Sequence, residues 1–423
     1  MKFKTSILVI AAVVATALQV TSCSEKLEDS IFDTHEYPLD RSAYTFPLDT
    51  FVKVNFLEPY NMRFIYQMEY IGSDKEKNLT PASYENSCKL AVLTKYLWYE
   101  SYKNQANEHD VFLKKYSPRI IHVIGSRNLN TSSGTETLGV TEGGTKVTLY
   151  RVNLLNPADI NNLNEYFFET MHHEFGHILD NTKLHPTPFN LLSNGLYNSA
   201  GWNDTPDSVA ASQGFFSNYA SSSYTEDWVE TLARYLTRDS ITLEKMFNTA
   251  EYEWETVDLT DKDKDGTVDA KDYTTMLKGY VDIDTIGYFK EDESGKGEHK
   301  VYRRACTRDN NDNVVLGEDG LPQWKKNAIG AKQVLMSKLQ FVREYMQEQY
   351  GINIDLLRAE IQEKQYRKGP DGKFLEETYF SDLTKRNEVR LLNALVYVDP
   401  ATGKSTMDVL LEELEKYKEV RNK

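Results

Sequence analysis

The chain has 423 residues, 40% of them hydrophobic and 12% aromatic, which is enough apolar material for a large buried core. This composition excludes disorder over the whole length. The 49 basic and 64 acidic side chains leave a formal net charge of −15. Because such a surface repels phosphate groups, nucleic acid is excluded as the expected partner.

The first residues are typical of a bacterial secretion signal. Lys2 and Lys4 precede an apolar run over residues 7–20, which is too short for a permanent membrane span. Residues 20–23 read VTSC and resemble a lipobox, which implies removal of residues 1–22 and acylation of Cys23. The alternative is an ordinary signal peptide followed by a chance cysteine. The lipobox predicts a protein held at a membrane by a lipid anchor.

Residues 23–45 are polar and are predicted to form a tether after the acylated cysteine. The acidic stretch SEKLED directly after Cys23 resembles the surface-export tag of Bacteroidetes-type lipoproteins, which implies the outer face of the outer membrane. In that oxidising compartment Cys88 and Cys306 could form a disulfide, or they could remain two buried thiols.

Hydrophobic patterns divide the rest of the chain into three parts: a core over 46–250, a polar insertion over 251–330 and a helical C-terminal region over 331–423. In the core, apolar runs predict helices at 87–102, 163–179 and 225–237 and strands at 119–124 and 145–152. In the C-terminal region they predict helices at 331–350, 352–366, 379–396 and 405–420. We therefore expect an α+β fold.

Residues 173–177 read HEFGH, and this segment falls in the predicted helix 163–179. His173 and His177 are four apart, so their imidazoles project from one face of the helix and can hold a single metal ion. Glu174 is placed to take a proton from a water activated by that ion. Gly176 weakens the helix, so we expect another segment to approach closely there. The alternative is two histidines that contact only their protein neighbours.

A catalytic zinc ion usually has a third protein ligand, and no third histidine follows at the nearby positions 180 or 183. The predicted helix 225–237 offers Glu226 and Glu230, four apart on one face. We expect Glu226 to bind the metal and Glu230 to accept the free N–H of a ligand histidine. Two alternatives remain open. Glu226 could instead form a capping box with Ser223, or Asp227 could be the ligand.

An oxyanion stabiliser is expected opposite the attacking water. Tyr219 is the candidate, and Tyr224 is the alternative. Asp180, one turn after His177, is predicted to support a ligand histidine, or it simply ends the helix.

These residues resemble the gluzincin family of metallopeptidases, and their spacing is especially similar to that of the catalytic domain of anthrax lethal factor. The resemblance implies that His173, His177 and Glu226 bind Zn²⁺, that Glu174 is the base, and that Tyr219 acts in the transition state. It also implies a zincin-like core, in which a twisted mixed sheet lies beside the two site-bearing helices. In that reading strand 145–152 forms the edge of the cleft, where an extended peptide could add.

Four further motifs resemble a lipoprotein family of Bacteroidetes, the substrate import-associated zinc metallohydrolase lipoproteins. They are PYN at 59–61, IGS at 124–126, GG at 143–144 and MHHE at 171–174. This resemblance covers nearly all of the mature chain. It implies outer-membrane import proteins as partners and leaves the substrate open.

A second ion is predicted in the insertion. Residues 261–272 read DKDKDGTVDAKD, which matches a twelve-residue calcium loop with Gly266 at the sixth position. The expected Ca²⁺ ligands are Asp261, Asp263, Asp265, Thr267, Asp269 and Asp272. Asp272 stands where EF-hands prefer glutamate, as in dockerin-type loops. The alternative is a solvated acidic turn.

The sequence therefore predicts a zinc-dependent peptidase that acts on protein or peptide substrates at the cell surface. One alternative is a metallohydrolase that cleaves another amide, such as a cell-wall or glycan amide. The other is a binding subunit of an import complex without catalytic activity. The intact Glu174 argues against a binding subunit, because binding alone needs no base.

Overall fold

The computed structural model describes residues 39–68, 77–106, 109–129, 136–142, 145–258, 264–266, 286–289, 299–311, 313–320, 322–381 and 386–420. The predicted signal peptide and Cys23 lie outside these residues. The chain divides into two compact units, 1–46 and 47–423. In the first, the Asp40 carboxylate accepts hydrogen bonds from the backbone N–H and the hydroxyl of Ser42.

A four-stranded mixed sheet has the strand order β1 (Arg63–Ile65), β2 (Ile120–Val123), β6 (Lys146–Leu149) and β5 (Gly139–Glu142). β1, β2 and β6 are parallel, and β5 pairs antiparallel with β6 at the edge. The runs predicted as strands thus form β2 and β6, with Ile121 and Val147 buried. The expectation that a peptide could add to strand 145–152 at the edge of the cleft is wrong, because β6 lies between β2 and β5.

Two long helices of the core extend about one turn beyond their predicted ends, and each contains a π-helical turn within its length. The first comprises α4 (Tyr84–Leu93), η2 (Thr94–Tyr99) and α5 (Glu100–Gln105), and the Ser83 side chain caps its N-terminus. The second comprises α7 (Ile160–Leu163), η4 (Asn164–Phe168) and α8 (Glu169–Thr182). The third core helix, α11 (Tyr224–Thr237), matches its prediction.

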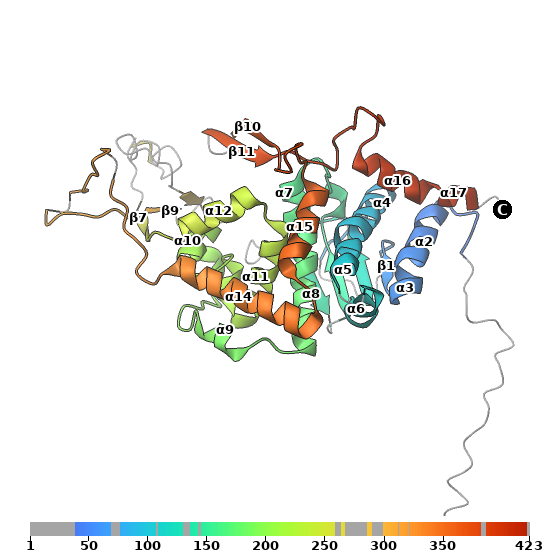
Figure 1. Ribbon diagram of the computed structural model, residues 1–423, viewed down its shortest axis with the longest axis horizontal. Coiled ribbons are helices and arrows are strands. Elements are labelled where there is room, and N and C mark those ends of the chain that lie inside the picture. The colour runs from blue at the N-terminus through green and yellow to red at the C-terminus, as the bar shows by residue number, and fades with distance from the viewer. Residues whose placement is uncertain are drawn as a thin grey trace, which may run out of the picture. The chain divides into compact units, whose positions relative to one another are not determined.

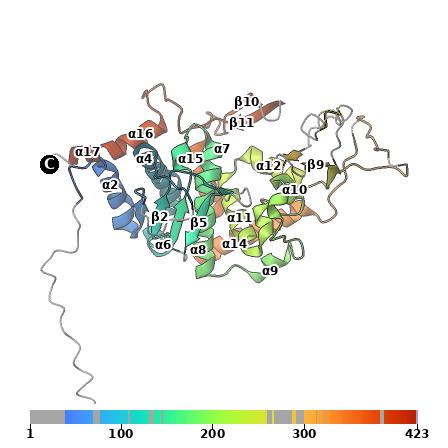
Figure 2. The same ribbon diagram turned by 180° about the vertical axis from the view of Figure 1, so that it is seen from behind.

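α8 lies between the sheet and α11 (Figure 1). β5 and β6 contact one side of α8, and the reverse view shows β5 beside this helix (Figure 2). On its other side α11 packs against α8 and also contacts α14 (Ala331–Tyr350) and α15 (Ile354–Gln365). The helix with the HEFGH segment therefore sits in the interior. Shorter elements complete the core: α2 (Phe46–Val52), η1 (Lys53–Leu57), α3 (Glu58–Tyr60), α6 (His109–Tyr116), β3 (Asn128–Leu129), β4 (Glu136–Thr137), η3 (Val152–Leu154), α9 (Thr187–Leu191), η5 (Trp202–Asp204), α10 (Asp207–Ser212), η6 (Tyr219–Ser222) and α12 (Ser240–Thr249).

The C-terminal region differs from its prediction in one place. The predicted helix 379–396 is wrong: β10 (Glu376–Ser381) and β11 (Arg386–Leu391) form an antiparallel hairpin there. Cross-strand pairs favour the hairpin, since the Tyr379 hydroxyl donates to Glu388 at 2.9 Å and Arg390 pairs with Glu377 at 2.7 Å. The final helices are α16 (Thr406–Glu415) and α17 (Tyr417–Val420).

The insertion contains a small antiparallel sheet with the order β7 (Trp254–Asp258), β9 (His299–Arg304) and β8 (Ile286–Phe289). Of the predicted calcium loop, only residues 264–266 are described, and Gly266 has a φ of 93°. The other predicted calcium ligands lie outside the described residues.

Cys88 is buried and Cys306 is half-buried, and both are free thiols, so the disulfide considered for them does not form in this structure. Within the described ranges, no helix is both long enough and apolar enough to cross a lipid bilayer.

Candidate metal centre

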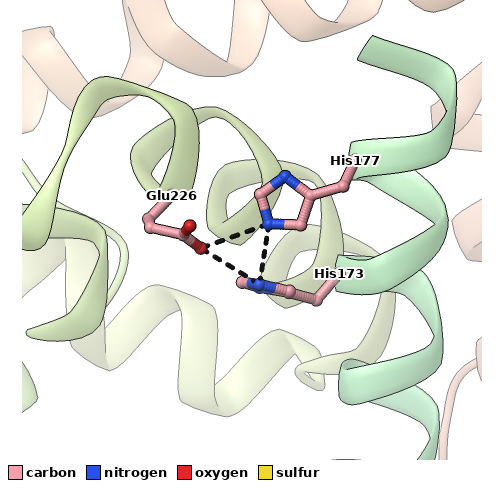
Figure 3. Close-up of side chains that lie close together, drawn as sticks. All are labelled: His173, His177 and Glu226. Atoms are coloured by element: carbon pink, nitrogen blue, oxygen red, sulfur yellow. Dashed lines mark hydrogen bonds and ion pairs between the residues drawn. The ribbon is translucent and has the colours of Figure 1, made fainter. Parts of the chain in front are cut away.

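Two histidines on α8 face α11 one helical turn apart (Figure 3). His173 is buried, His177 is half-buried, and their Nε2 atoms are 3.2 Å apart. The four-residue spacing of the HEFGH segment produces this arrangement, because residues i and i+4 share one face of a helix. The two Nε2 atoms thus face the same point in front of α8.

Glu226, in the first turn of α11, adds a third donor (Figure 3). Its Oε2 lies 3.1 Å from Nε2 of His173 and 3.3 Å from Nε2 of His177. The Ser223 hydroxyl caps α11 by accepting from the backbone N–H of Glu226 at 3.3 Å, while the Glu226 carboxylate faces the histidines. Asp227 is engaged elsewhere, with Lys338 at 2.6 Å. The Glu226 carboxylate, and not that of Asp227, thus lies beside both histidines.

The three donor atoms fit a zinc ion. Zinc bonds of about 2.0–2.1 Å to nitrogen or oxygen place tetrahedral ligands roughly 3.3 Å from each other. The observed separations of 3.1–3.3 Å are close to that value. Two imidazoles and one carboxylate are also a common donor set of catalytic zinc sites. Among the described residues, this is the one group of three or more potential metal-binding side chains.

His173, His177 and Glu226 form a triad whose contacts shift the pKa values of His173 and Glu226. Burial disfavours the charged form of His173, but its hydrogen bonds with Glu226 and Glu230 prevail and hold its pKa well above the usual value. Burial acts in the opposite direction on Glu226, yet the two histidines lower the pKa of its carboxyl to about 2. The Glu226 carboxylate is therefore ionised at neutral pH and available to a cation.

Glu230 fixes the orientation of His173. Its Oε1 lies 2.7 Å from Nδ1 of His173. Because a carboxylate can only accept, Nδ1 carries a hydrogen, which leaves Nε2 as the ring nitrogen that can bind a metal. The other Glu230 oxygen accepts from the Ser217 hydroxyl at 2.6 Å and from Nε of Arg234 at 3.1 Å. The contact predicted between Glu230 and a ligand histidine is thus present.

Ser217 and Arg234 support the site, a role that the sequence did not predict for either residue. Arg234 is half-buried, and besides Glu230 it pairs with Glu169 of α8 and with Asp207 of α10. These carboxylates raise its pKa despite its burial. One arginine thereby joins three elements behind the metal ligands. An i, i+4 spacing between Glu230 and Arg234 is the only local signal that the sequence offers.

Gly176 lets α8 and α11 approach each other at the site. A Cβ atom at this position would lie 2.9 Å from Cγ1 and 3.1 Å from Cβ of Val229. The expectation that another segment packs closely on Gly176 is therefore confirmed, and that segment is α11. The close contact brings Glu226 within reach of the histidines on α8.

Glu174 is buried on the side of α8 that faces the edge strand β5. A Cβ atom on Gly139 of β5 would lie 3.6 Å from Oε1 of Glu174 and 2.2 Å from Cγ2 of Thr170. Gly139 is therefore a strand residue selected for close approach to α8. A chain paired with β5 would pass next to the Glu174 carboxylate.

Of the two tyrosine candidates, Tyr219 lies at the triad. Its ring centroid is 5.8 Å from that of His173, whereas Tyr224 is 49% exposed and lies 6.1 Å from the ring of His185. Burial and the nearby carboxylates of Glu226, Glu230 and Glu174 raise the pKa of the Tyr219 phenol. Tyr219 thus stays protonated and can donate a hydrogen bond.

Asp180 does not contact either triad histidine through its described hydrogen bonds. Its carboxylate accepts from the backbone N–H of His185 at 2.7 Å and lies 2.9 Å from the ring Nδ1 of His185. The expectation that Asp180 supports a metal ligand is corrected: it holds the segment that follows α8. His185 in turn stacks on Trp228 of α11 at 4.9 Å.

The α+β fold and the two-histidine, one-glutamate set define the class of zinc metallopeptidases with an HExxH helix. The family model described as "Putative zinc-binding metallo-peptidase" matches residues 42–355, and the chain belongs to this family. The chain is also similar to the crystal structure of a putative zinc-binding metallo-peptidase from Bacteroides caccae. The two are 29% identical, with a TM-score of 0.50, over 77% of this chain and 93% of that one. No curated protein matches.

Proposed function

We propose that this protein hydrolyses peptide bonds with Glu174 as general base and Tyr219 as oxyanion stabiliser, at an ion held by His173, His177 and Glu226. The observation that carries the proposal is the convergence of three donor atoms, 3.1–3.3 Å apart, next to a buried carboxylate on the same helix turn. Zinc bound there would polarise the scissile carbonyl and lower the pKa of a water molecule.

Three side chains carry out the other parts of the reaction: Glu174, Tyr219 and Glu230. Glu174 accepts a proton from the attacking water and delivers it to the leaving amine. The protonated Tyr219 phenol donates a hydrogen bond to the carbonyl oxygen as negative charge develops on it. Glu230 keeps His173 in one tautomer throughout. An extended substrate adds to the edge of β5 that pairs with no other strand among the described residues, so that its backbone passes Gly139 and Glu174.

The cellular setting is part of the proposal. The leader over 1–22 and the VTSC segment support a lipid anchor at Cys23 and a position on the outer membrane surface, beside import proteins. Palmitate labelling of the full chain and of Cys23→Ala tests the anchor, since only the wild type should incorporate the label.

Calcium binding at 261–272 is supported by the twelve-residue spacing. Calcium titration of the protein beside Asp261→Asn tests it.

The catalytic proposal is tested with the mature chain, Glu174→Gln and the control Glu165→Gln, which makes the same change earlier on the same helix. Zinc content and cleavage of a peptide library are measured for each. The wild type and the control should bind about one zinc per chain and cut peptides, whereas Glu174→Gln should bind zinc without cutting. If the wild type binds zinc but cleaves no peptide, the substrate class is wrong and non-peptide amides are the next candidates. If the wild type does not bind zinc, the alternative of a binding subunit without catalytic activity is favoured.

A further inference from the structure

Tyr219 is held by an aromatic neighbour from a preceding loop. The ring of Trp202, in η5, packs edge-on against Tyr219 with centroids 4.8 Å apart. Tyr219 itself begins the short turn η6, which has only four residues. So short a turn fixes its side chains weakly on its own. The position of the Tyr219 ring over His173 therefore depends on what packs behind it.

The loop that carries Trp202 is hydrogen-bonded to the chain on both sides of Tyr219. The Asn218 side chain donates to the carbonyl of Thr205 at 3.0 Å. The backbone N–H of Asn198 donates to the carbonyl of Ser221 at 2.7 Å. The loop and η6 are thus one unit, and a shift of the loop moves Tyr219 with it.

The insertion holds this loop in place. Tyr302, a buried residue of β9, donates its hydroxyl to the backbone carbonyl of Asp204 at 3.1 Å. Asp204 ends η5 and directly precedes Thr205, the partner of Asn218. A continuous path of contacts therefore runs from Tyr302 through η5 and Trp202 to Tyr219 and His173.

We propose that the insertion 251–330 positions the oxyanion-stabilising tyrosine, with Tyr302 and Trp202 as positioning residues. The inference rests on the proposed role of Tyr219. A hydrogen-bond donor stabilises a transition state best when its position is set before the reaction, because no reorganisation is then needed. Tyr302 acts on the chemical step without touching the substrate. The insertion thereby contributes to catalysis through the position of Tyr219.

The test compares wild type, Tyr302→Phe, Tyr219→Phe and the double variant, all loaded with zinc. Tyr302→Phe removes one neutral hydrogen bond, so we expect kcat to fall about 2- to 10-fold with KM nearly unchanged. In the Tyr219→Phe background the same substitution should have no further effect on kcat, because the residue it positions has lost its hydroxyl. Tyr252→Phe is the matched control, since the Tyr252 ring stacks on Arg304 within the insertion, at 4.0 Å.

A second readout does not require activity. The emission of Trp202 is obtained by subtracting the spectrum of Trp202→Phe, once in the wild-type background and once in the Tyr302→Phe background. We expect Tyr302→Phe to shift this emission and to make it more sensitive to acrylamide quenching. An unchanged Trp202 emission overturns the inference, as does an equal loss of kcat with and without the Tyr219 hydroxyl. Failure of the zinc-loaded wild type to cleave any peptide would instead overturn the proposed function.

Discussion

Nδ1 of His173 lies 2.7 Å from Oε1 of Glu230, on the helix that also supplies Glu226. Glu226 and Glu230 are one turn apart on α11, so a single helix provides both a metal ligand and the group that orients the ligand beside it. A rigid shift of α11 would alter both contacts together. The affinity of the site for metal therefore depends on how firmly α11 is held.

Replacing Glu230 with glutamine should lower zinc affinity by about 10- to 100-fold. The amide has no charge to stabilise His173, and its NH₂ group faces the Ser217 and Arg234 donors that now contact Oε2. Competition with a chromophoric chelator measures the change. Glu244→Gln, the same substitution at an exposed position of α12, should leave the affinity unaltered. Equal affinities in the two variants would contradict the role given to Glu230.

Gly176→Ala tests the contact between α8 and α11. Helix propensity alone would raise the free energy of unfolding by about 1 kcal/mol. The new Cβ would meet Val229 at 2.9 Å, and overpacking of this kind costs about 1–3 kcal/mol. We expect a net loss of stability in urea denaturation and weaker zinc binding.

Adding Val229→Ala makes room for the new methyl group, so the double variant should lose less stability than the two single changes together. A Gly176→Ala protein more stable than the wild type would mean that the helices do not need this close contact.

The parts of the site that depend on local spacing could be predicted from the sequence. His173 and His177 lie four apart on one helix, and Glu226 and Glu230 repeat that spacing on another. A helix places such pairs on one face whatever surrounds it. The choice of Glu226 also followed from chemistry, because a catalytic zinc site needs a third ligand.

Features that depend on distant segments could not be predicted. β5 is not among the strands that the sequence predicts, and the need for Gly139 at that position appears only from the approach of Thr170. The strands 376–381 and 386–391 overlap the predicted helix 379–396, because apolar residues in short runs fit either period. Nothing in the sequence near Asp227 indicates that Lys338 is its partner, 111 residues away (338 − 227).

The ion pair between Asp227 and Lys338 should be important for stability, since both side chains are fully buried and 2.6 Å apart. Burial lowers the pKa of Lys338 and raises that of Asp227 to about 6. Lys338→Met leaves a buried carboxylate without its cation, so we expect a loss of about 3–5 kcal/mol in the free energy of unfolding. Denaturation at saturating zinc measures it.

The double variant Lys338→Met with Asp227→Asn should recover much of this loss, because no uncompensated charge remains. Lys404→Met is the matched control: it breaks an exposed pair with Glu412 at 2.6 Å and should cost about 0–1 kcal/mol. A similar cost for Lys338→Met and Lys404→Met would show that the buried pair adds nothing beyond its exposed counterpart.

The pair of His185 and Asp180 should make stability depend on pH. Burial lowers the pKa of His185, but the hydrogen bond and charge of Asp180 prevail and raise it above 6.5. A raised histidine pKa means that the folded state binds the proton more tightly than the unfolded state. The stabilisation is therefore fully present below the ordinary pKa of 6.5 and is lost as the pH rises through the higher folded value.

We expect His185→Gln to destabilise the protein more at about pH 5.5 than at about pH 9. Urea midpoints of wild type and variant at the two pH values measure the difference. Asp180→Asn should remove this pH dependence, since it deletes the charge that raises the pKa. A stability difference that does not change with pH would show that His185 is not charged in the folded protein.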